Sequence, residues 1–209
     1  MQLVSLYGKP LSGKGTQAKN FIQQGFFHLP MGDYMRDQAA AGDPECQAVM
    51  SLIEAGDFVP DELVCGIVDR IVAEKERQGF KGVLLDGFPR TMPQAEWLDD
   101  FAAERGYPLN VVYLEIKDSE NHILNSRRLQ RIDEYLAAGK EPRPEDLDVN
   151  KFWKRVRLYD DVTSKVANHY EGRGQLVRID GLQSPQAVWN EISQRLNLGT
   201  RKPGPQLGF

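Results

Sequence analysis

A glycine-rich run near the start of the chain carries the clearest chemistry. Residues 8–17 hold three glycines, two lysines and a threonine. Gly8 and Gly13 tolerate the left-handed backbone that turns successive N–H groups inward, and a helix that begins near Lys14 adds the positive end of its dipole. The Lys14 ammonium can reach the outer phosphates of a bound polyphosphate. The run therefore predicts a phosphate-binding loop.

The spacing of this run is that of the Walker A motif. Gly15 stands where that motif usually has Ser or Thr, and the hydroxyl comes one residue later, at Thr16. An apolar, strand-like run (2–7) precedes the loop and a helix-like segment (17–24) follows it. A plain turn between a strand and a helix would not need a lysine at this place. The loop alone indicates only a nucleoside triphosphate.

A second group of polar residues follows a later apolar run. Asp86 comes directly after residues 82–85, at the carboxyl end of a predicted strand, where parallel sheets place ligands. Its carboxylate could hold Mg²⁺ directly or through water, as could the hydroxyl of Thr16, or it could simply cap the turn at Gly87. The planar guanidinium of Arg90 suits a phosphate, although it could equally serve a helix end or a surface carboxylate.

Five short runs of apolar and β-branched residues predict the strands that position these groups: 2–7, 26–29, 82–85, 110–116 and 176–179. The runs are continuous rather than alternating, which indicates strands covered on both faces. Helical patterns separate most of them. The fold class is therefore α/β, with a five-stranded parallel sheet flanked by helices.

Helical patterns between the second and third strands predict an inserted helical unit. The patterns cover residues 33–41, 46–53 and 61–78. Asp43 has the position of an N-cap for the second of these helices. After the third strand, Thr91 and Gln94 have the spacing of a capping box for a further helix.

Length and composition set the limits of function. With 209 residues the chain suits one domain, and a net charge of −4 argues against a general binder of nucleic acid or membrane surfaces. Cys46 and Cys65 form no C-x-x-C pair and read as buried thiols in a reducing compartment. No apolar run reaches the ~18 residues needed to span a bilayer, and the start of the chain does not resemble a signal segment. We expect a cytoplasmic protein.

Several segments together resemble the adenylate kinase family of nucleoside monophosphate kinases. They are the loop 8–17, residues 28–36, residues 61–64 and above all residues 84–95, which contain the run Asp-Gly-Phe-Pro-Arg. The resemblance extends from residue 2 to about residue 196. It implies a P-loop kinase fold in one nucleotide-kinase domain (1–209), with a monophosphate-binding insert (31–63), a short lid (132–148) and a tail (200–209) without assigned chemistry.

The resemblance implies a site for two substrates, ATP and a nucleoside monophosphate, with AMP as the leading acceptor. ATP would be bound by Gly8, Gly13, Lys14, Gly15, Thr16, Gln17 and Arg127. The monophosphate would be bound by Met31, Arg36, Arg90 and Gln94. The phosphoryl transfer would be assisted by Lys14, Arg90, Arg131, Arg143 and Arg157, with Arg155 as the fallback for Arg157. Mg²⁺ would be held, mostly through water, by Thr16, Asp33 and Asp86.

Other expectations follow from the same resemblance. The lid contains no cysteine, which excludes a zinc-bearing lid. Phosphoryl transfer needs no general base here, so His28, His122 and His169 are interpreted as structural or surface residues. We expect a monomer without nucleic-acid or membrane partners.

Three positions depart from the family pattern. Leu11 stands where the family loop usually has glycine, so its side chain points either toward the phosphates or outward. Pro30 and Met31 stand where adenylate kinases usually have Ser-Thr, and Met31 cannot offer a base the hydrogen bond of a threonine. A UMP/CMP-type kinase therefore remains an alternative, as does a nucleotide-binding sensor with weak catalysis. The Asp-Gly-Phe-Pro-Arg run disfavours a P-loop kinase for a small metabolite.

Overall fold

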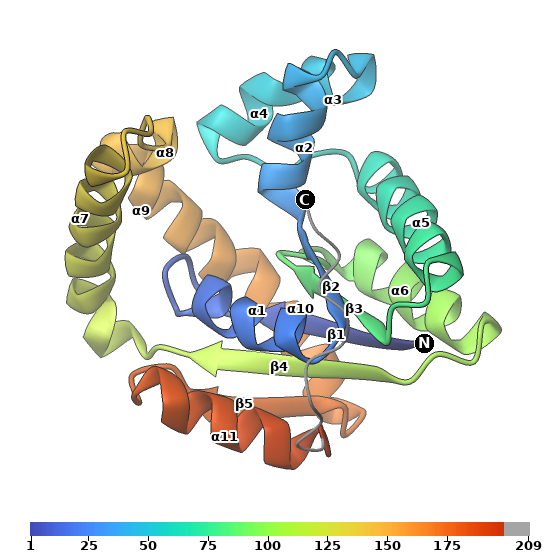
Figure 1. Cartoon of the computed structure of the whole chain (residues 1–209). Helices are drawn as coiled ribbons and strands as arrows, with labels where there is room; N and C mark the ends of the chain where they lie inside the picture. Colours follow the sequence, from blue (N-terminus) through green and yellow to red (C-terminus); the bar gives the residue numbers. More distant parts are fainter. Residues whose placement is uncertain (199–209) are drawn as a thin grey trace.

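The protein folds around a five-stranded parallel sheet, seen in a computed structural model that describes residues 1–198 without the side chain of Asp118. The strand order is β2-β3-β1-β4-β5 (Figure 1). The strands are β1 (Gln2–Tyr7), β2 (Phe26–Pro30), β3 (Gly82–Asp86), β4 (Leu109–Glu115) and β5 (Leu176–Asp180). The predicted α/β class and all five strands are confirmed. The predicted tail (200–209) lies outside the described residues.

Helices cover both faces of the sheet, which explains the continuous apolar runs. On one face, β1 packs against α1 (Lys14–Gln23) and α11 (Pro185–Arg195). On the other face lie α5 (Asp61–Arg77), α6 (Met92–Glu104) and α10 (Ser164–Gly172). Leu3 and Val4, neighbours that point to opposite faces, are both fully buried. The carboxyl ends of the strands are thereby held rigidly at one edge.

The insert after β2 contains three short helices, α2 (Met31–Ala40), α3 (Pro44–Ala48) and α4 (Met50–Ala55). Asp43 caps α3 as predicted, since its side chain accepts from the Cys46 N–H. The single helix predicted over 46–53 is wrong, because the chain leaves helical geometry at Val49 (φ −106°, ψ 2°). The Val49 N–H bonds back only three residues, to the Cys46 carbonyl, which tightens the chain and starts a new helix. Cys46 and Cys65 are buried free thiols, as expected.

A second helical arm follows β4, through the short turn η1 (Asp118–Glu120). It consists of α7 (Asn121–Ala137), α8 (Pro144–Leu147) and α9 (Val149–Leu158), and returns through a π-helical turn, η2 (Tyr159–Thr163), into α10. In Figure 1 this arm and the insert rise on different sides above the sheet. The fully buried Phe152 packs with Ile116, Leu124 and Val156 at the root of the arm. The predicted lid (132–148) covers the end of α7, the connection and α8.

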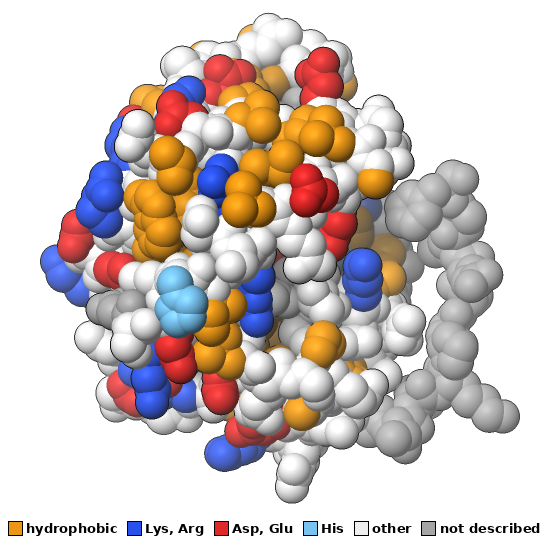
Figure 2. All heavy atoms as spheres, turned by 90° about the vertical axis from the view of Figure 1, so that its left-hand side faces the viewer, with side chains coloured by type: hydrophobic (Ala, Val, Ile, Leu, Met, Phe, Trp, Pro, Cys, Tyr) orange, Lys and Arg blue, Asp and Glu red, His pale blue; other side chains and the backbone are white. Residues whose placement is uncertain are grey.

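The outer side of the second arm is partly apolar. Leu129, Leu136, Leu147 and Val149 are 43–60% exposed. Figure 2, which views the molecule from this side, shows hydrophobic side chains gathered on the surface. Within residues 1–198, no helix has the length and apolar character to cross a membrane.

Phe152→Ala should lower the free energy of unfolding by about 3–5 kcal/mol, because it empties the fully buried root of the second arm. Urea titration followed by circular dichroism measures the loss. Leu136→Ala, at a position 60% exposed, is the matched control and should stay within about 0.5 kcal/mol. A loss below about 1 kcal/mol for Phe152→Ala would show that this cluster does not anchor the arm.

Candidate active site

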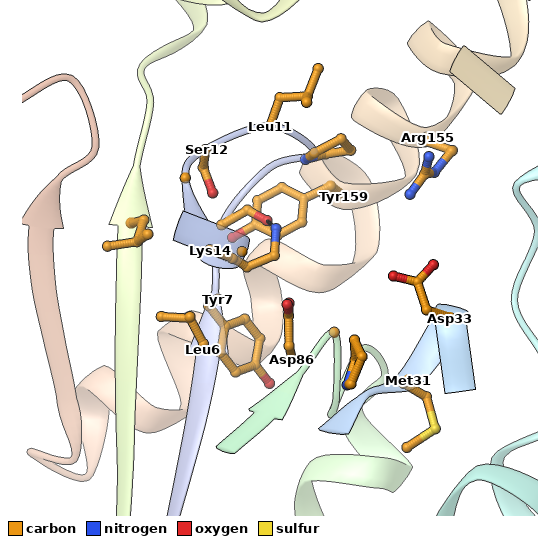
Figure 3. A pocket seen from close by; sticks show the side chains of 18 of the residues that line it. Leu6, Tyr7, Leu11, Ser12, Lys14, Met31, Asp33, Asp86, Arg155 and Tyr159 are labelled. Carbon is orange, nitrogen blue, oxygen red and sulfur yellow. Dashed lines mark hydrogen bonds between the residues drawn. The ribbon is translucent and has the colours of Figure 1, made fainter. Parts of the chain in front are cut away.

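A cleft of about 990 Å³ lies over the carboxyl ends of the strands, between the insert and the second arm. It is lined by every site residue predicted from the sequence except Arg157: Gly8, Gly13, Lys14, Gly15, Thr16, Gln17, Met31, Asp33, Arg36, Asp86, Arg90, Gln94, Arg127, Arg131 and Arg143. Figure 3 shows Lys14, Asp86, Asp33 and Arg155 around the same space. Groups far apart in the chain thus meet at one place.

The predicted phosphate loop has the backbone that its glycines require. Gly8 and Gly13 have φ values of 145° and 106°. A Cβ on Gly8 would lie 2.3 Å from the Ser12 Oγ and 2.7 Å from the Leu114 carbonyl oxygen, so only glycine fits. The Lys14 Nζ donates to the carbonyl oxygens of Gly8 (2.8 Å) and Lys9 (3.0 Å). The ammonium is therefore already held over the loop.

Leu11 adopts the left-handed conformation that glycine usually supplies, with φ 65°. This backbone costs a leucine roughly 1–2 kcal/mol. Its side chain points away from Lys14 (Figure 3) and packs against the cluster around Phe152. Its carbonyl oxygen accepts a hydrogen bond from Arg127 Nη1 (2.9 Å). Of the two alternatives that the sequence left open, the Leu11 side chain therefore points outward, and it does not occupy the space above the loop where phosphates would bind.

Asp86 ends β3 beside His28, whose Nε2 lies 3.2 Å from the Asp86 Oδ2. Burial would raise the pKa of Asp86, but His28, Lys14 and Arg90 together hold it below its usual value, so the carboxylate stays charged. His28 also lines the cleft, which sequence reasoning missed by treating it as structural or surface. β2 pairs with β3 so that His28 lies opposite Leu84, two residues before Asp86 in the strand, and only this register could have signalled the contact.

The donor set at the loop suits Mg²⁺ only in part. Asp86 and the exposed Thr16 offer oxygen ligands of the kind Mg²⁺ takes together with water and substrate phosphates. Asp33 is engaged otherwise: its Oδ1 accepts from Arg36 (2.9 Å) and its Oδ2 from Arg143 (2.7 Å). In residues 1–198 no three His, Cys, Asp or Glu side chains form a group that could hold a metal ion by themselves. These residues therefore suit a Mg²⁺ ion that enters together with a phosphate substrate, which would supply the remaining oxygen ligands.

Carboxylates of α8 tie the arginines of both arms together. Glu145, fully buried, accepts from Arg36 Nη2 (2.5 Å) and from Arg155 Nη1 (3.3 Å). Asp146, 1% exposed, accepts from Arg131 Nη2 (2.5 Å). Since Arg36 belongs to the insert and Glu145 to the second arm, the Arg36–Glu145 pair holds the two arms against each other. Crowded cations and acids of this kind form a site that recognises anions.

Arg155, rather than Arg157, faces the cleft. Arg155 lines the cleft, whereas Arg157 is exposed and does not line it, so the structure favours the fallback Arg155 over Arg157 as the site residue. Two residues on a helix are separated by roughly 200°, so only one of the pair can face inward. Burial, opposed by Glu145, lowers the pKa of Arg155 to about 10, which leaves it charged at neutral pH.

Comparison with known proteins agrees with this geometry. The model of the adenylate kinase family matches residues 6–175. The chain is 39% identical to a protein named adenylate kinase from Azorhizobium caulinodans and 37% identical to one from Thermus thermophilus, in each case over 94% of this chain and 98% of the relative. A relative of the same name, from Vanderwaltozyma polyspora, is 33% identical over 90% of this chain and 92% of the relative.

The chain belongs to the adenylate kinase family. The resemblance seen in the sequence is thereby confirmed, and with it the class of enzyme, a phosphotransferase acting on nucleoside monophosphates. The roles of individual residues in this family member stay predictions.

Binding of ATP should depend on pH through Lys14. Burial lowers the pKa of Lys14 to about 8, with Arg90, Arg155 and Arg131 adding to the effect and Asp86 opposing it. A bound polyphosphate favours the charged form, so above pH 8 binding must take up a proton. The affinity should fall by up to about tenfold per pH unit above that value. Calorimetry in buffers of different ionisation enthalpy measures the proton uptake.

Lys14→Arg is the matched control for this prediction, since arginine stays charged throughout. Its ATP affinity, whatever its value at pH 7, should not change between pH 7 and 9.5. A wild-type affinity that is equally flat over this range would contradict the assignment of Lys14.

The two arginines of α9 give a second test. Arg155→Ala should reduce kcat/KM by at least about 100-fold, because it removes a half-buried cation from the cleft. Arg157→Ala, two residues away and exposed, should stay within about twofold of wild type. Steady-state kinetics with circular dichroism as the folding control measures both. The reverse order of effects would restore Arg157 as the site residue.

Proposed function

We propose that the protein is an adenylate kinase that transfers the γ-phosphoryl group of ATP to AMP, giving two ADP. The observation that carries the proposal is the convergence, in one cleft, of the lysine-bearing phosphate loop with arginines from the core, the insert and the second arm. To bind a single polyphosphate, the protein would need only the loop. To bind two anionic substrates end to end, it needs the additional cations to neutralise the second set of phosphates.

The cleft suits phosphoryl transfer because little covalent chemistry is asked of the protein. The loop and Lys14 would hold the phosphates of ATP, while Arg36 and Arg90 would hold the phosphate of the acceptor. Arg131, Arg143 and Arg155 would neutralise the charge of the transferred group. Mg²⁺, bound with ATP through Thr16 and Asp86, would screen the donor phosphates. Closed arms exclude water, which would otherwise compete with the acceptor.

The ion pairs of the arms leave room for phosphate. An arginine has five N–H donors. Arg36 uses one on Asp33 and one on Glu145. Its remaining donors are available to an acceptor phosphate without loss of the contacts between the arms. Closure and substrate binding can therefore support each other.

The acceptor side of the cleft is apolar, with one amide. Met31, Met35, Val59 and Val64 line it together with Gln94. Met31 is 3% exposed and gives no hydrogen bond to a base, which is the departure noted in the sequence. Base recognition therefore falls on Gln94. The relatives, named adenylate kinases, support AMP over the pyrimidine monophosphates. Cytoplasmic location and the monomeric state stay predictions from the sequence.

A panel of AMP, CMP, UMP, GMP and IMP with Mg·ATP tests the proposal through coupled ADP detection. We expect kcat/KM for AMP to exceed that for each of the others by at least about tenfold. Lys14→Met should lose at least about 100-fold in activity while staying folded. A preference for UMP or CMP would establish the pyrimidine alternative. Tight ATP binding with no turnover of any acceptor would establish a sensor instead of an enzyme.

A further inference from the structure

The side-chain amide of Gln94 is held by two neighbours at the acceptor end of the cleft. Gln94 lies on α6 and is 3% exposed. Its Nε2 donates to the Asp61 Oδ1 (2.6 Å), and its Oε1 accepts from the backbone N–H of Arg90 (2.7 Å). The predicted capping box is realised in one half only: the Thr91 side chain accepts from the Gln94 N–H (3.3 Å), but the Gln94 side chain bonds Arg90 instead of Thr91.

These partners fix which way round the amide stands. A glutamine amide can exchange its oxygen and nitrogen by a half turn. Here the Arg90 N–H can only donate, so it requires Oε1, and the Asp61 Oδ1 accepts from both Gln94 and Thr91, so it requires Nε2. Thr91 Oγ1 also donates to the Asp61 Oδ1 (3.0 Å), which holds the carboxylate in place. If the amide were turned, its N–H₂ would face the Arg90 N–H, donor against donor, and its oxygen would face the Asp61 carboxylate, acceptor against acceptor.

The fixed amide has one N–H and one oxygen lone pair left for a ligand. Adenine presents an acceptor at N1 beside a donor at the 6-amino group. Hypoxanthine and guanine present the reverse, a donor at N1 beside the 6-oxo acceptor. With the sugar and phosphate held elsewhere in the cleft, an amide of fixed direction matches one pattern, whereas a free amide could turn to match both. A buried mismatch leaves polar groups unpaired, which is costly.

We propose that Asp61, together with the backbone N–H of Arg90, determines the choice between 6-amino and 6-oxo purine monophosphates by locking the direction of the Gln94 amide. Asp61 is a positioning residue that acts through Gln94. This inference rests on the proposed function, since it assumes that Gln94 meets the acceptor base. Asp61 begins α5, directly after the five-residue link from the insert, so the same residue connects the acceptor-binding arm to the core.

The test compares AMP with IMP in three variants at saturating Mg·ATP. The wild type should prefer AMP over IMP by about 100-fold in kcat/KM. Asp61→Ala should reduce this ratio by about tenfold, mainly through KM of the acceptor, while KM for ATP stays unchanged. Asp61→Asn keeps the size of the side chain but can donate as well as accept, so it no longer fixes the Gln94 amide and the ratio should fall as in Asp61→Ala. Glu62→Ala, the next residue and exposed, is the matched control and should behave as wild type.

Asp61→Ser covers the case in which the alanine variant does not fold. A serine hydroxyl either donates or accepts, so it releases the direction of the amide, and the AMP/IMP ratio should fall as in Asp61→Ala. An unchanged ratio in the folded variant, or equal losses for AMP and IMP, would overturn the inference and leave Asp61 a structural residue. A wild type that uses AMP and IMP equally would overturn it too. A wild type without AMP turnover would instead overturn the proposed function.

Discussion

The mutual repulsion of clustered cations is the constraint on which the site depends. Lys14, Arg90 and Arg155 line one cleft; the charges of Arg90 and Arg155 lower the pKa of Lys14, and the charge of Arg90 lowers the pKa of Arg155. The cluster is stable without substrate because acids lie among the cations. Glu145 and Asp146 are themselves almost wholly buried, where an unpaired carboxylate would be very unfavourable. The arginines and the carboxylates therefore stabilise each other, and either group without the other would destabilise the folded protein.

This constraint explains why the cations come from separate parts of the chain. The core supplies Lys14 and Arg90, the insert supplies Arg36, and the second arm supplies the remaining arginines. The ion pairs between Asp33 and Arg143 and between Arg36 and Glu145 bring the arms together. Opening the arms would separate the cations and expose the acids to water. Phosphates that enter the closed cleft take over part of the neutralisation, so binding and closure are coupled through charge.

Local patterns in the sequence were sufficient for the fold and for most of the site. The loop, the Asp86 turn and the five strands are encoded within short segments, and the structure brings them together as predicted. Three features depended on more distant geometry. The choice of Arg155 over Arg157 depends on which face of α9 meets the cleft. The contact of His28 with Asp86 depends on strand pairing, and the network around Gln94 depends on where α5 begins relative to α6.

In the proposed function, one cleft holds donor and acceptor together, with their phosphates in line. A compound of two adenosines joined by five phosphates spans both positions at once. Titration calorimetry should show one molecule bound per chain, at least about 100-fold more tightly than ATP, with AMP unable to bind afterwards. Two molecules bound per chain, or AMP binding that persists in the presence of this compound, would contradict the account.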